Sequence, residues 1–241
     1  MIHSSIENFQ PEQVLNNEQK PIVSTSAQVS PMQCYAPFSG SPSSELYNMD
    51  CVAGMKHYPD KYFDLAIVDP PYGIGLSNNP FRQKQEKKNW DMSIPEMGYF
   101  IELFRVSKNQ IIWGGNYFDL PKSQGFLIWD KKQPYDFSSA MCEFAWCSIQ
   151  KPAKIYQKHV VTAELNKIHP TQKPIQLYEF CLKFAELEKG AKVLDTHVGS
   201  GSSRIACYLN GFDFVGFEID EDYCQSSEKR FRNAIKQQRL F

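Results

Sequence analysis

The chain has 241 residues with 26 basic and 27 acidic side chains, so its net charge of -1 excludes a polycation, and any affinity for nucleic acid needs a local basic face. Its seven cysteines lack a CxxC pair, which argues against a disulfide framework or a zinc ribbon, and we expect no metal site. We expect a cytoplasmic protein, because residues 1–20 lack an apolar leader and no stretch approaches the roughly 20 apolar residues of a membrane helix.

Residues 1–42 are rich in Ser, Gln, Asn and Pro, which predicts a flexible N-terminal arm before a single domain over residues 43–241. In chain order, the apolar periods predict a strand over 46–49, a helix over 52–58, a strand over 62–68, a helix over 95–106, strands over 110–113, 126–129, 144–149 and 154–159, a helix over 174–187, a strand over 192–194, a helix over 202–209, a strand over 214–217 and a helix over 221–238. Strands that alternate with helices are typical of an α/β fold.

Asp69-Pro70-Pro71-Tyr72 directly follows the strand expected over residues 62–68. Two consecutive prolines cannot continue the hydrogen bonding of a sheet, so the strand must end there. Ligands of open α/β sheets bind at the carboxyl ends of the strands. We therefore expect a carboxylate, a rigid carbonyl and an aromatic ring together at an active site, a combination suited to gripping a flat, amino-bearing base.

A glycine turn, Gly199-Ser200-Gly201, precedes the helix expected over residues 202–209. Glycines let the backbone approach a ligand, and a helix N-terminus favours negative charge, which indicates a nucleotide-like cofactor. A dinucleotide fingerprint would need a third glycine where the chain has Arg204, so that signal is weak. Asp195 favours a different cofactor, because its carboxylate would repel a pyrophosphate and attract the ammonium group of an amino acid.

Glu218 follows the next strand, where ribose hydroxyl groups would need an acceptor. Taken alone, Glu218 could equally be a surface acid at the end of a strand. Together with Asp195 it favours ribose binding. S-adenosylmethionine combines a ribose with an amino acid and is the cofactor we expect.

Three motifs follow one another along the chain: Asp69-Pro70-Pro71-Tyr72, His169-Pro170-Thr171-Gln172-Lys173-Pro174, and Asp195 to Gly201. With these motifs in this order, residues 44–235 closely resemble the beta-group DNA amino-methyltransferases, bacterial and phage enzymes that methylate exocyclic amines, mostly N6 of adenine. The resemblance implies a Rossmann-like methyltransferase fold, a doubly wound and mostly parallel sheet with one reversed strand. It also implies an adenine-specific DNA methyltransferase that flips its target base, with restriction-modification, phage protection and regulation as open purposes.

The resemblance assigns roles to single residues. Asp69 and the carbonyl of Pro70 would accept hydrogen bonds from the target amino group, and Tyr72 would stack on the flipped base. The residues expected to hold the cofactor are Asp50, Cys51, Asp69, Thr171, Lys173, Asp195, Gly199, Gly201 and Glu218. One position departs from the family, because relatives usually carry Asp-Pro-Phe where this chain has Asp195-Thr196-His197, and an aromatic contact to the cofactor is therefore expected to be missing.

The segment from Phe81 to Trp90 is basic, polar and aromatic. We hypothesise a mobile loop that closes on DNA and brings Arg82, Lys84, Lys87 and Lys88 near phosphates, with an ordinary solvated loop as the alternative. Residues 151–168 leave room for only a short target-recognition insertion. Sequence specificity would then be short, or shared between the subunits of a homodimer.

Three other functions stay open. Methylation of cytosine N4 is the nearest, although such enzymes usually carry Ser at the position of Asp69. Methylation of a protein or RNA amine is the second alternative, although relatives with such substrates tend to carry Asn at the position of Asp69. A catalytically silent DNA-binding subunit would be expected to have lost Asp69 or Asp195, and this chain has both.

Overall fold

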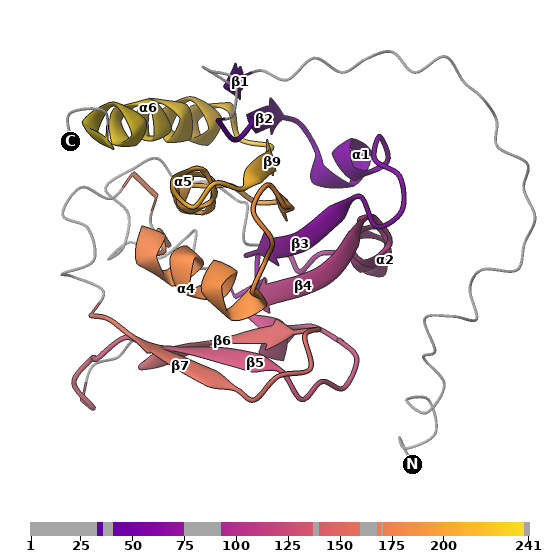
Figure 1. Ribbon diagram of the computed structural model, residues 1–241. Helices are drawn as coiled ribbons and strands as arrows, with labels where there is room; N and C mark the ends of the chain where they lie inside the picture. The colour runs from indigo at the N-terminus through magenta and orange to yellow at the C-terminus, as the bar shows by residue number, and fades with distance from the viewer. Residues whose placement is uncertain are drawn as a thin grey trace, which may run out of the picture. The chain divides into compact units, whose positions relative to one another are not determined.

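The computed structural model describes residues 33–35, 41–74, 93–136, 140–159, 168–169 and 171–238, and every structural statement below concerns these residues. A nine-stranded sheet runs through them in the order β1-β2-β9-β8-β3-β4-β6-β5-β7 (Figure 1). The strands are β1 (Gln33–Tyr35), β2 (Ser44–Asn48), β3 (Phe63–Val68), β4 (Ser107–Trp113), β5 (Phe126–Asp130), β6 (Cys142–Cys147), β7 (Lys154–Gln157), β8 (Lys192–Asp195) and β9 (Asp213–Glu218). The helices are α1 (Cys51–Met55), α2 (Met97–Val106), the 3-10 turn η3 (Gly115–Tyr117), α4 (Ile175–Ala185), α5 (Ser202–Leu209) and α6 (Glu221–Gln238).

The sheet is mostly parallel, as the sequence predicted. Strands β2, β9, β8, β3 and β4 run parallel to one another, and β7 runs parallel to β5. The resemblance implied one reversed strand, and the described sheet has two: β6, which pairs antiparallel with both β4 and β5, and β1, which pairs antiparallel with β2. The order of the parallel strands reverses between β8 and β3, which creates the switch point where open α/β sheets bind ligands.

The strand at one edge of the sheet was not predicted from the sequence, and the strand at the other edge was. Residues 33–35 lie in the range assigned to the flexible arm, yet they form β1 and pair antiparallel with β2. The open edge of β2 offers backbone donors and acceptors, which a segment too short to be recognised by its own pattern can satisfy. At the other edge, residues 154–157 form β7, which confirms the strand expected over 154–159, while residues 160–167 of the expected target-recognition insertion lie outside the described residues.

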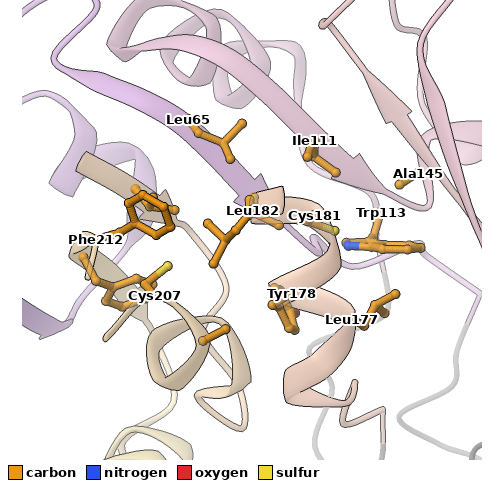
Figure 2. Packing of buried hydrophobic residues seen from close by; sticks show 14 of the residues in the cluster. Leu65, Ile111, Trp113, Ala145, Leu177, Tyr178, Cys181, Leu182, Cys207 and Phe212 are labelled. Atoms are coloured by element: carbon orange, nitrogen blue, oxygen red, sulfur yellow. The ribbon is translucent and has the colours of Figure 1, made fainter. Parts of the chain in front are cut away.

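Both faces of the sheet are covered by helices. Side chains alternate along β3, so Leu65 and Ile67 pack among residues of α4, α5 and α6, while Ala66 and Val68 pack among residues of α1 and α2. Figure 2 shows the first of these layers, in which Leu65 and Trp113 of the sheet lie over side chains of α4 and α5. Burial on both faces explains why β3 reads as a continuous apolar run.

Local signals set the ends of the helices. The Asp50 side chain accepts a hydrogen bond from the Ala53 amide at 2.8 Å and caps α1, which ends at Met55 and is shorter than expected. Pro174 precedes α4 as its cap residue, and Gly201, with a φ of 75°, precedes α5. In the part of the chain that the structure covers, no helix is both long and apolar enough to pass through a membrane.

Candidate active site

Four acidic residues lie along the carboxyl edge of four neighbouring parallel strands. Asp50 follows β2, Glu218 ends β9, Asp195 ends β8 and Asp69 follows β3. The strands of a parallel sheet end at one edge, so residues from distant parts of the sequence converge there. The sequence predicted each of these four acids as a site residue, and the topology brings them to the same edge.

The carboxylate of Asp69 is held by two side chains. The Tyr72 hydroxyl donates to Oδ1 at 2.5 Å, and the Lys173 ammonium donates to Oδ2 at 2.5 Å. A carboxylate has about four acceptor positions, so both oxygens can still accept hydrogen bonds from a ligand. The resemblance places Lys173 among the residues expected to hold the cofactor, and in the structure its ammonium pairs with Asp69 and with a further acid.

That further acid is Glu143 on β6, which the sequence did not single out. Its Oε2 lies 3.0 Å from Lys173 Nζ, and its Oε1 lies 2.5 Å from Lys131 Nζ. Burial raises the pKa of Glu143, but the two ammonium groups outweigh burial and lower it to about 2. Burial alone would lower the pKa of Lys173, but the charges of Asp69 and Glu143 outweigh burial and raise it. Lys131, Glu143, Lys173 and Asp69 thus form one cluster of two basic and two acidic side chains.

The ring of Tyr72 is positioned by the turn after β4. It stacks on Tyr117 with the ring centroids 4.9 Å apart and the planes 14° from parallel. A Cβ atom at Gly114 would lie 2.1 Å from Cε1 of Tyr72, and Gly114 has a φ of 69°, so only glycine fits this position. Burial and Asp69 raise the pKa of Tyr72 well above its ordinary value, so its hydroxyl stays a donor.

The glycine turn is tied to Glu218. The Gly199 amide donates to Oε2 of Glu218 at 2.8 Å, and the Asp220 amide donates to Oε1 at 2.9 Å. Gly199 and Gly201 both have positive φ values, of 50° and 75°, which bring the backbone of the turn close to the strand ends. Glu218 therefore orders this turn, and the remaining acceptor positions of its carboxylate are available for hydroxyl groups.

The carboxyl group of Asp195 is buried at the end of β8. It is 1 % exposed and accepts hydrogen bonds from the Ser203 hydroxyl at 2.5 Å and from the His197 amide at 2.9 Å. Burial raises its pKa to about 7, the two hydrogen bonds oppose that rise, and the charges of Asp69 and Glu218 add to it. A ligand ammonium or sulfonium group would relieve this repulsion, so the acids at the strand ends fit a cationic cofactor.

His197 stands where the resemblance predicted a missing aromatic contact. Its Nδ1 lies 2.9 Å from the Thr196 hydroxyl, which in turn lies 2.6 Å from the Tyr99 hydroxyl. Burial lowers the pKa of His197 to about 4, so the imidazole is neutral at physiological pH. The rings of Tyr99 and His197 also pack edge to face, 5.5 Å apart. The position thus retains a neutral aromatic ring within a group of polar hydroxyls.

The other predicted site residues have simpler surroundings. Cys51 begins α1 and is buried, which raises its pKa to about 12 and leaves no thiolate for nucleophilic chemistry. The Thr171 hydroxyl lies 3.0 Å from Nδ1 of His169, and Pro70 is buried. Arg82, Lys84, Lys87 and Lys88, the predicted DNA-binding residues, lie outside the described residues.

Comparison with known proteins finds a matching protein family and a related protein, both described as methylases. Residues 112–229 match a family described as DNA methylase. YubD of Escherichia coli (strain K12), a protein named as a methylase, is 26% identical over 209 residues, which are 78% of this chain and 89% of that protein.

Two solved structures share the fold. The M1.HpyAVI–SAM complex has a TM-score of 0.53 and 19% identity, and the match covers 77% of this chain and 98% of that one. The cytosine-N4-specific PvuII DNA methyltransferase has a TM-score of 0.53 and 13% identity, with 82% and 93% covered. The family match, the relative and the shared Rossmann-like fold together support a DNA methyltransferase.

Proposed function

We propose that this protein transfers a methyl group from S-adenosylmethionine to an exocyclic amine of a DNA base, with N6 of adenine as the acceptor. The observation that carries the proposal is the position of Asp69 and Asp195 at the carboxyl ends of the neighbouring parallel strands β3 and β8. One acid is available for an amine acceptor and the other for a cationic donor. The match to the DNA methylase family supports the same reaction.

The residues at the strand ends fit the cofactor by their chemistry. Asp195 offers a buried carboxylate for the ammonium group, and Glu218 offers acceptor positions for the ribose hydroxyls. The glycine turn at Gly199 keeps side-chain bulk away from the same edge. S-adenosylmethionine, when bound, supplies a methyl group activated by its sulfonium charge.

Asp69 and Pro70 prepare the acceptor amine. The lone pair of an exocyclic amine is conjugated into the ring of the base, which makes the nitrogen a poor nucleophile. Two acceptors that accept hydrogen bonds from both N–H groups of the amine draw the nitrogen toward a tetrahedral state in which the lone pair is exposed. The Asp69 carboxylate, fixed by Tyr72 and Lys173, and the carbonyl of Pro70 supply such a pair. Positioning of this kind can lower a barrier by up to about 7–11 kcal/mol.

Tyr72 would hold the flipped base. Base flipping costs a few kcal/mol, and stacking on an aromatic ring returns about 1–3 kcal/mol per base. In the structure the Tyr72 ring already has a stacked partner, Tyr117, which is 43 % exposed. We expect the base to take the position of Tyr117 on this ring, or to enter between the two rings. Arg82, Lys84, Lys87 and Lys88 remain our candidates for phosphate contacts, and we expect a sequence specificity that is either short or shared between the subunits of a homodimer.

Adenine is proposed over cytosine because the resembling N4-cytosine enzymes usually carry Ser at the position of Asp69. The test is transfer of labelled methyl groups to duplex DNA, followed by analysis of the released nucleosides. We expect N6-methyladenine. N4-methylcytosine as the sole product would overturn the choice of base, and binding of S-adenosylmethionine without any transfer would favour the catalytically silent subunit.

A further inference from the structure

We propose that Glu143 is a positioning residue for methyl transfer, which acts by sharing the Lys173 ammonium with Asp69. This inference rests on the proposed function, and it adds to the reaction a residue from the reversed strand β6. The residue lies 74 positions beyond Asp69 and outside all three motifs that carry the resemblance.

The geometry places one ammonium between two carboxylates. Lys173 Nζ lies 2.5 Å from Oδ2 of Asp69 and 3.0 Å from Oε2 of Glu143, and the Lys173 side chain is 3 % exposed. The rings of Tyr72 and Trp113 lie 5.9 Å and 5.6 Å from the same nitrogen. Lys173 is therefore enclosed, and its position depends on both acids.

Sharing changes what Asp69 can do. An ammonium paired with Asp69 alone would neutralise that carboxylate and take part of its capacity to accept hydrogen bonds. Glu143 draws on the same positive charge, because a buried charge interacts strongly with every neighbour within a few ångströms. Asp69 then keeps more negative charge for the acceptor amine, while Lys173 still fixes its orientation.

Glu143 is itself anchored from the sheet, so it can hold Lys173 in place. Its Oε1 pairs with Lys131 at 2.5 Å, and the Lys131 amide donates to the Met141 carbonyl at 2.9 Å. The Lys131 ammonium also lies 5.3 Å from the centre of the Trp129 ring. These contacts join the end of β5 to the start of β6 and give Glu143 a fixed position.

The test compares Glu143→Gln, Lys131→Gln and the double variant with the wild-type protein. For each we would measure kcat for methyl transfer, Kd for S-adenosylmethionine and the melting temperature. Glu143→Gln should lower kcat about 10- to 100-fold, the range in which loss of a supporting contact typically misplaces a reacting group, with little change in Kd. Lys131→Gln should lower kcat less than Glu143→Gln does, because Glu143 still pairs with Lys173. Glu143→Asp, which keeps the charge, should retain more activity than Glu143→Gln.

The double variant decides between positioning and simple charge balance. It removes one positive and one negative charge, so it also carries the test if Glu143→Gln does not fold. We expect its kcat to stay as low as that of Glu143→Gln. Wild-type kcat in Glu143→Gln or in the double variant would overturn the inference, as would a loss of cofactor affinity equal to the loss in kcat. A wild-type protein that transfers no methyl group would instead overturn the proposed function.

Discussion

Lys173 and Asp69 form an ion pair of 2.5 Å between two residues that lie 104 positions apart in the sequence. The pair joins the turn after β3 to the segment that leads into α4, so two of the three sequence motifs meet in one contact. Tyr72 adds a second hydrogen bond to the same carboxylate. Asp69 is thereby oriented before any substrate arrives, as a preorganised acceptor requires.

The Tyr72 hydroxyl and the Tyr72 ring should have separable effects. Tyr72→Phe removes the hydrogen bond to Asp69 and keeps the stacking surface, so kcat should fall about 10- to 100-fold, because a hydrogen bond to a charged group contributes about 1.5–3 kcal/mol. Tyr72→Ala also removes the ring, and affinity for DNA with an unpaired 2-aminopurine at the target should weaken by about 1–3 kcal/mol. Equal DNA affinities of the Phe and Ala variants, measured by 2-aminopurine fluorescence, would exclude stacking on this ring.

The site could be predicted from the sequence to the extent that local patterns define it. The double proline after β3, the glycines before α5 and the acids at the strand ends are local signals, and the structure brings Asp69, Asp195 and Glu218 to one edge of the sheet. Their alignment follows from the mostly parallel sheet that the resemblance implied.

The remainder of the site depends on pairing between distant segments. Glu143 reads as a polar residue before an apolar run, and only the antiparallel pairing of β6 with β4 and β5 carries it to Lys173. Tyr117 reaches Tyr72 only because Gly114 turns the chain beneath that ring. Strand β1 depends in the same way on the open edge of β2. Such contacts leave no periodic signal in the segments that make them.

Binding of S-adenosylmethionine should strengthen as the pH rises toward 7. The pKa of Asp195 is about 7 in the protein without a cofactor, so below that pH the carboxyl is increasingly protonated and loses its attraction for a cation. Affinity should increase by up to about tenfold per pH unit between pH 5 and 7, the limit for one proton. Calorimetric titration across this range measures the slope, which Asp195→Asn should flatten.

Stability should change with pH in the opposite direction. The folded pKa of Asp195 lies above its unfolded value of about 3.9, so its contribution to stability is complete below about pH 4 and is lost as the pH rises through about 7. Glu218, whose pKa is also raised by burial, acts in the same direction. The unfolding free energy of Asp195→Asn should therefore fall less than that of the wild-type protein between pH 5 and 7. An identical pH dependence of the two proteins would show that Asp195 is ionised throughout.

Arg204 should matter for stability, although it stands where a dinucleotide-binding turn would have glycine. It is fully buried, and its guanidinium donates to Glu228 at 2.5 Å and to the Ser44 hydroxyl at 2.8 Å. Glu228→Gln leaves this buried charge without its partner and should cost about 3–5 kcal/mol in urea unfolding. Arg232 also pairs with Glu228, and the Arg232 side chain is 57% exposed. Arg232→Gln should therefore cost less than about 1 kcal/mol. Similar costs for the two variants would contradict this account.

The most direct test of the proposed function measures methyl transfer and cofactor binding side by side for Asp69→Asn. The variant keeps the size of the side chain and replaces the negatively charged carboxylate, which would accept a hydrogen bond from the amine, with a neutral amide. We predict that kcat falls by at least about 100-fold, as when a preorganised hydrogen-bonding group is removed from other active sites, while Kd for S-adenosylmethionine stays close to the wild-type value. Transfer at the wild-type rate by Asp69→Asn would contradict the assignment of Asp69 as the acceptor that prepares the amine.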